Sequence, residues 1–150
     1  EKIRASRLFL NKKILGLAFK YLKTIPILHK IHFYETVKSK NFTKSQFWHL
    51  DTTHKKIFKI FWSPFGVQQN SGPTTVCLSG KKSKFWQFSN YPNFPSYFND
   101  EDFKKSKLNS FPVEKITMNS DELSICDTCN LFHYGSRFEK KKIYCYFRIC

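Results

Sequence analysis

The stretch FWHLDTTHKK places two side chains that can bind a metal, His49 and Asp51, on either side of a single leucine. The flanking residues favour a β-strand, in which successive side chains point to opposite faces. His49 and Asp51 would then share one face, with Trp48 and Leu50 on the other. A second histidine brought from elsewhere would complete a set of two imidazoles and one carboxylate with open coordination positions. Taken alone, the motif also fits a strand end where both polar side chains are solvated.

A second stretch, SICDTCNLFHYGSRF, carries Cys126, Cys129 and His133. Thiolates and an imidazole at this spacing can share a tetrahedral zinc ion, for which Cys145 or Cys77 would have to supply the fourth ligand. In the competing interpretation, both cysteines of the pair are ordinary buried or loop residues. His133 then joins the metal ligands of the first stretch.

The basic composition raises the question of a nucleic-acid or membrane partner. The chain has 150 residues, which suits one domain, and its net charge is +15. Only four of the 26 basic residues are arginine, whereas sites that read bases or grip phosphates favour arginine over lysine. We therefore expect the lysine runs at 81–84 and 140–142 to be solvated loops, and we do not expect nucleic acid as a partner.

The cysteines and the apolar segments bear on the compartment. Five cysteines are an odd number without a secretory signal, which favours a reducing compartment. The apolar stretch 8–22 is interrupted by Asn11, Lys12 and Lys13, so it is neither a bilayer-spanning run nor a signal peptide. We expect a soluble, cytoplasmic protein, and the sequence does not indicate its oligomeric state.

A helix is expected near the start of the chain, with Asn11 as its N-cap. Apolar residues recur there at spacings of three and four, which is typical of a helix with one buried stripe. The stripe consists of Ile14, Leu15, Ala18, Phe19 and Leu22.

The rest of the chain reads as short strands separated by turns. The predicted strands are 27–36, 46–51, 56–62, 74–78, 113–118, 122–126 and 143–149. A turn is expected at Gln68 to Pro73, and the aromatic, proline-bearing stretch 79–110 is expected to be a long loop. Short strands after one helix predict a mainly β fold, an antiparallel sandwich or barrel.

Together these stretches resemble a known family. SQFWHLDTTHKKIFKIFW, VQQNSGPTTVCLSGKK and DELSICDTCNLFHYGSRFEKKKIYCYF follow one another in the order seen in the phytanoyl-CoA dioxygenase-like branch of the Fe(II)- and 2-oxoglutarate-dependent oxygenases. The resemblance implies a double-stranded β-helix, a cupin-like jelly-roll barrel. It implies one domain over 1–150, truncated at its N-terminus, with 1–24 helical and 25–150 forming the barrel around an insert at 81–110.

The resemblance also implies the roles of individual residues. His49 and Asp51 match the proximal ligands of Fe(II), and His133 matches the distal one. Asp127 falls where the family carries an aspartate that supports a ligand. The iron would use 2-oxoglutarate and O2 to hydroxylate a small or lipid-like organic substrate.

One implied residue departs from the family pattern. The far carboxylate of 2-oxoglutarate is usually held by an arginine on the strand after the distal histidine, but here that strand begins with lysines. Alternation places Lys140 and Lys142 on one face, and Lys142 is the better candidate because an apolar run follows it. Lysine offers a single charge-assisted contact where arginine forms a fork, so affinity for 2-oxoglutarate would be lower.

The departures leave a second functional class open. A degenerate, non-catalytic barrel could act as a basic module that binds nucleic acid or another anionic partner. The lysine in place of arginine, the missing N-terminal region and the positive charge motivate this alternative.

Overall fold

A computed structural model of the chain describes residues 10–36, 41–51, 55–78, 97–135, 137 and 142–149. The described elements alternate short strands with two α-helices and two turns of 3-10 helix. In chain order they are α2 (Lys12–Leu22), β1 (Leu28–Thr36), η1 (Lys44–Gln46), β2 (Phe58–Trp62), β3 (Thr75–Cys77), α4 (Asp100–Lys105), η2 (Lys107–Ser110), β4 (Val113–Lys115), β5 (Ser124–Cys126), β6 (His133–Tyr134) and β7 (Lys142–Ile149).

The predicted first helix is present as α2 and begins as expected. The Asn11 side chain accepts a hydrogen bond from the backbone N–H of Ile14 at 3.0 Å, which confirms the N-cap. Ile14 and Ala18 are buried, but Phe19 is 54% exposed, so the buried stripe is narrower than predicted. None of the described helices is long and apolar enough to cross a bilayer.

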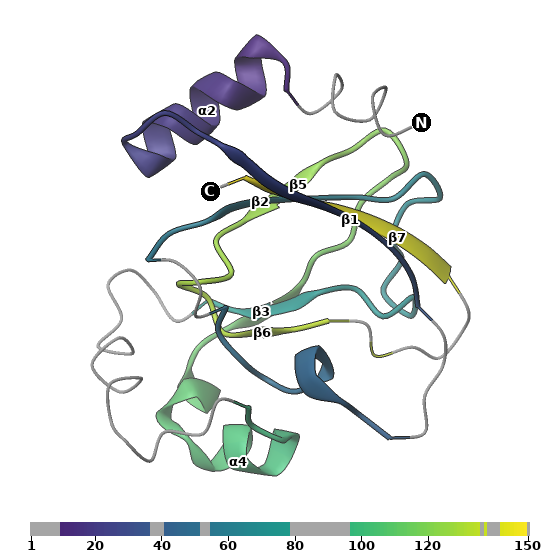
Figure 1. Cartoon of the computed structure of the whole chain (residues 1–150). Helices are drawn as coiled ribbons and strands as arrows, with labels where there is room; N and C mark the ends of the chain where they lie inside the picture. Colours follow the sequence, from purple (N-terminus) through teal and green to yellow (C-terminus); the bar gives the residue numbers. More distant parts are fainter. Residues whose placement is uncertain are drawn as a thin grey trace.

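The larger sheet has four antiparallel strands in the order β1-β7-β2-β5. Phe58 and Ile60 of β2 pack against Ile14 and Ala18 of α2, so α2 covers one face of this sheet. Since strand residues alternate, Lys59 projects from the opposite face. Figure 1 shows α2 on one side of this sheet and the second sheet on the other.

The smaller sheet has three antiparallel strands in the order β4-β3-β6. Residues 48 and 49 extend it through isolated bridges, from Trp48 to Phe98 and from His49 to His133. Its outer face carries a second apolar core that α4 and η2 cover (Figure 1). That core consists of Trp48, Cys77, Phe98, Phe103, Leu108 and Phe132. The layers therefore run α2, large sheet, small sheet, α4.

The mainly β prediction is confirmed, since the strands far outnumber the helices. Within the described residues they form two small sheets and do not close into a barrel. Several boundaries differ: of the strand predicted at 46–51, Gln46 ends η1 and 47–51 is a segment with single bridges, and 113–118 and 122–126 shorten to β4 and β5. The short strand β6 was not predicted.

The prediction of a loop over 79–110 is wrong for its described part, 97–110. Asn99 caps α4 by accepting from the backbone N–H of Asp102 at 2.8 Å. Acidic residues fill the first turn of α4 and lysines fill its last turn, which complements the helix dipole. These helix signals are local, and the flanking aromatic and proline-rich sequence obscured them.

We expect the α2 face of the large sheet to dominate stability. Ile60 is fully buried there, whereas its cross-strand partner Ile125 is 45% exposed. Ile60→Ala should lower the free energy of unfolding by about 2–5 kcal/mol, because it removes buried methyl groups and leaves a cavity. Ile125→Ala is the matched control and should cost about 1 kcal/mol or less. Equal losses in urea denaturation would contradict this packing.

Candidate metal centre

Two histidines distant in sequence are joined through their backbones. The N–H of His49 donates to the carbonyl of His133 at 2.9 Å, and the N–H of His133 donates back at 3.0 Å. An antiparallel pair of this kind places both side chains on the same face of a sheet. Their ring centroids lie 4.2 Å apart.

Asp51 joins this pair from the same extended segment. Its Oδ1 lies 3.8 Å from Nε2 of His49, as expected for side chains two residues apart on one face. One ligand atom from each of His49, Asp51 and His133 lies within 4.8 Å of the other two. The three residues predicted as metal ligands therefore meet at one point and could hold a metal ion.

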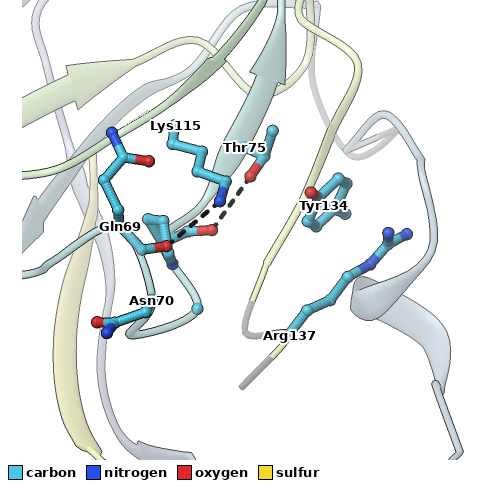
Figure 2. A pocket seen from close by; sticks show the side chains of 8 residues that line it. Gln69, Asn70, Thr75, Lys115, Tyr134 and Arg137 are labelled. Atoms are coloured by element: carbon cyan, nitrogen blue, oxygen red, sulfur yellow. Dashed lines mark hydrogen bonds between the residues drawn. The ribbon is translucent and has the colours of Figure 1, made fainter. Parts of the chain in front are cut away.

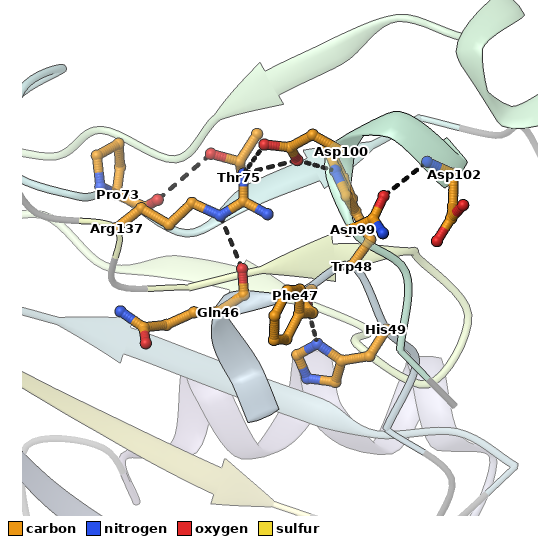
Figure 3. A network of polar contacts seen from close by, with 10 residues as sticks. All are labelled: Gln46, Phe47, Trp48, His49, Pro73, Thr75, Asn99, Asp100, Asp102 and Arg137. Carbon is orange, nitrogen blue, oxygen red and sulfur yellow. Dashed lines mark hydrogen bonds and ion pairs between the residues drawn. The ribbon is translucent and has the colours of Figure 1, made fainter. Parts of the chain in front are cut away.

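A hydrogen bond to the backbone carbonyl two residues earlier orients each imidazole ring. Nδ1 of His49 lies 2.8 Å from the carbonyl oxygen of Phe47 (Figure 3), and Nδ1 of His133 lies 3.0 Å from that of Leu131. A carbonyl only accepts, so Nδ1 carries the proton and donates in each case. Nε2 is then the unprotonated atom that can bind a metal, and the ring orientation is fixed as in many metal sites.

The second oxygen of Asp51 is held by the protein itself. The ammonium of Lys59 donates to Oδ2, and so does the hydroxyl of Thr128, at 2.6 Å. The backbone N–H of Asp51 also donates to the carbonyl of Thr128 at 2.9 Å. Oδ2 is thus engaged, while Oδ1 lies on the side of His49 Nε2.

Sequence reasoning missed both side chains that donate to Asp51, Thr128 and Lys59. Lys59 is only 7% exposed and reaches from β2 of the large sheet to Asp51 beside the small sheet. The sequence did contain one indication of its orientation. Lys59 lies between Phe58 and Ile60, and because these two form the apolar face of the strand, Lys59 must lie on the opposite face.

Burial and charge favour the forms of these residues that bind metal. Burial lowers the pKa of His133 to about 3, aided by the charges of His49 and Lys59. Burial also lowers the pKa of His49. Burial alone would raise the pKa of Asp51, but the charge of Lys59, with that of His133 and the hydrogen bonds from Lys59 and Thr128, holds it below its usual value. At neutral pH the site therefore presents two neutral imidazoles and one carboxylate.

The zinc alternative finds no support in the part of the chain that the structure describes. There, the residues that gather as a metal-capable group are His49, Asp51 and His133, and neither Cys126 nor Cys129 belongs to it. Burial raises the pKa of Cys126 to about 12, so it is a protonated thiol at neutral pH.

Asp127 shapes the turn beside the site. Its carboxylate accepts from the hydroxyl of Tyr21, from the backbone N–H of Cys129 at 2.9 Å and from the Asn130 side chain at 2.6 Å. Asp127 directly precedes Thr128, whose hydroxyl donates to Asp51. Asp127 therefore supports the metal ligands by holding this turn in place.

Of the two lysines expected to bind 2-oxoglutarate, Lys142 lies within the described residues and Lys140 does not. Lys142 begins β7, where its backbone pairs with Thr36.

A polar pocket of about 70 Å³ lies on the other face of the small sheet. Tyr134 and Thr75, which face each other across β6 and β3, line it together with Lys115 and Arg137 (Figure 2). Tyr134 follows His133 in the strand, so its side chain points away from the metal-capable cluster. The pocket and the cluster are therefore separate sites.

Arg137 ties the elements beside this pocket together. Its guanidinium donates to both carboxylate oxygens of Asp100, at 2.7 and 2.8 Å, and to the carbonyl of Gln46 at 2.7 Å (Figure 3). It also lies over the Tyr134 ring, 3.6 Å from the centroid. These contacts join α4, η1 and the end of β6, which indicates a structural role.

No model of a known protein family matches the chain, and no curated protein matches it either.

The lowered histidine pKa values predict how stability depends on pH. Below about pH 6.5 the unfolded chain takes up protons that the native site excludes, so stability falls as the pH falls toward about 3. Each such histidine contributes a slope of up to about 1.4 kcal/mol per pH unit. Asp51 titrates below this range, so the interval from about pH 6 to 4.5 isolates the histidines.

His133→Asn should flatten this slope in urea denaturation with a chelator present, and exposed His29 provides the control. His29→Asn removes one histidine from an exposed position, so it shows what the substitution itself does without a change at the buried site. If His133→Asn and the wild type lost stability equally over this interval, His133 would not be held neutral.

Proposed function

We propose that the chain is a non-haem Fe(II)- and 2-oxoglutarate-dependent dioxygenase of the phytanoyl-CoA dioxygenase-like type, acting on a small or lipid-like organic substrate. The observation that carries the proposal is the meeting of His49, Asp51 and His133 at one point. Two imidazoles and one carboxylate are the ligand set of the Fe(II) oxygenases that leave coordination positions open.

The arrangement of the layers agrees with this proposal. The cluster lies on the inner face of the small sheet, and the Lys59 side chain reaches it from the large sheet. Two facing antiparallel sheets with the ligands between them are what a jelly-roll fold would provide. We therefore extend the proposal to a double-stranded β-helix as the complete fold.

The hydrogen bonds of the three residues support one ligand atom from each for the proposed iron ion. His49 and His133 would each bind through Nε2, because Nδ1 is engaged by a carbonyl. Asp51 would bind through Oδ1, because Oδ2 is engaged by Lys59 and Thr128. When bound, Fe(II) would supply the redox chemistry that couples decarboxylation of 2-oxoglutarate to hydroxylation of a C–H bond.

The protein supplies position and protonation state. Carbonyl acceptors hold both imidazole rings, so little conformational entropy is lost when a metal binds. The far carboxylate of 2-oxoglutarate needs a cation, and we assign this role to Lys142, with Lys140 as the second choice. A lysine contact of this kind contributes roughly 1.5–3 kcal/mol.

Two measurements on the same preparation test the proposal. Protein loaded anaerobically with Fe(II) is assayed for bound iron and then, with 2-oxoglutarate and O2 added, for succinate. We expect one iron per chain and release of succinate. His49→Ala should weaken metal binding by more than the roughly 10- to 100-fold typical of changes outside the ligand set. His29→Ala, an exposed histidine on β1, is the matched control and should bind and react as the wild type.

Two results would contradict the proposal. Wild-type protein that binds iron but releases no more succinate than His49→Ala would refute turnover. Absence of iron binding, with a salt-sensitive shift of a DNA or RNA probe, would favour the non-catalytic basic module that the net charge of +15 motivates.

A further inference from the structure

Lys59 introduces a positive charge into the candidate metal centre. Its ammonium donates to Oδ2 of Asp51 and lies 5.8 Å from the centroid of the Phe61 ring, on the inner face of β2. The Lys59 side chain is 9% exposed, so water screens this charge poorly. A buried ammonium beside a ligand carboxylate changes the electrostatics of whatever binds there.

The formal charges of the side chains at the site can be added up. His49 and His133 bind a metal as neutral imidazoles, since Nδ1 of each donates to a carbonyl and Nε2 is the ligand atom, and the Lys59 ammonium cancels the charge of the Asp51 carboxylate. Among the described residues, the side chains of the site therefore offset none of the charge on a bound divalent ion, whereas the two histidines and the aspartate alone would offset one unit. An uncompensated double charge in a buried site is costly, and a ligand with two negative charges would neutralise it.

We infer that Lys59 makes the loaded metal centre selective for oxygen chelators carrying two negative charges, the class to which 2-oxoglutarate belongs. This inference rests on the proposed function, since it requires a divalent ion at the cluster. It gives Lys59 a role in selecting the ligand, separate from the contact assigned to Lys142. It also gives a functional reason for a lysine at a strand position whose neighbours, Phe58 and Ile60, are buried and apolar.

A purely structural role makes a different prediction. If Lys59 only held Oδ2 of Asp51 in place, removing the other donor to that oxygen should have a similar effect. That donor is the Thr128 hydroxyl, at 2.6 Å, and it carries no charge. Comparison of Lys59→Met with Thr128→Val therefore separates the charge of the site from the orientation of Asp51.

The test uses the full chain loaded with Co(II), whose absorption reports ligand binding without turnover. Two bidentate probes are titrated: oxalate, which carries two negative charges, and picolinate, which carries one. Lys59→Met should retain Co(II) but bind oxalate roughly ten- to a hundredfold more weakly, with a much smaller change for picolinate. Thr128→Val should affect both probes alike, and Lys59→Arg should restore the preference for oxalate.

The possible results distinguish an error in the inference about Lys59 from an error in the proposed metal site. If Lys59→Met keeps Co(II) and the wild-type preference for oxalate, the inference is wrong and the proposed metal site stands. Loss of Co(II) from a folded Lys59→Met protein, or failure of Lys59→Arg to restore the preference, would show that Lys59 acts on structure and would also overturn the inference. Wild-type protein that binds no Co(II) or Fe(II) would remove the proposed function itself.

Discussion

The reciprocal backbone hydrogen bonds between His49 and His133 are the constraint on which the site depends. This pair sets the register between the segment at 47–51 and β6, and a strand register determines which side chains share a face. A slip of one residue would replace an imidazole of the pair with Leu50 or Phe132. In the observed register Asp51 falls on the same face as both rings, and the carbonyls of residues 47 and 131 accept from them.

Packing on the outer faces of the two sheets stabilises this register. The apolar cores lie on the outer faces, under α2 for the large sheet and under α4 for the small one (Figure 1). The inner faces carry polar groups that would be costly to bury alone, but each is paired: Asp51 with Lys59 and Thr128, and each imidazole with a carbonyl. The ion pair between Lys59 and Asp51 also links the two sheets. Electrostatics at the site and packing between the layers are therefore coupled.

Local sequence patterns predicted the elements whose signals are local. Asn11 and the apolar spacing after it placed α2, and the strand predicted at 27–36 is present as β1. Alternation also predicted that His49 and Asp51 converge, although 46–51 is not a regular strand. From the residue pattern alone, His133 could belong either to a zinc site with Cys126 and Cys129 or to a metal site with His49 and Asp51. The family resemblance assigned it to the first site, and the bridge to His49 agrees with that assignment.

What could not be predicted depends on contacts between distant segments. The pairing of 47–51 with β6 joins two parts of the chain that no local rule connects, and β6 is too short to show a period. The contact of Lys59 with Asp51 could not be predicted because the two residues come from different layers. Phe19 was assigned to the buried stripe, but the buried residues of α2 are Ile14 and Ala18, and Phe19 is exposed.

The central claim is that His49, Asp51 and His133 hold one metal ion between the two sheets. The most direct measurement is anomalous diffraction at the iron edge from crystals loaded anaerobically with Fe(II). The account predicts a single strong peak within coordination distance of both histidine Nε2 atoms and of Asp51 Oδ1. A peak at Cys126 and Cys129, or no ordered peak near these three residues, would contradict it.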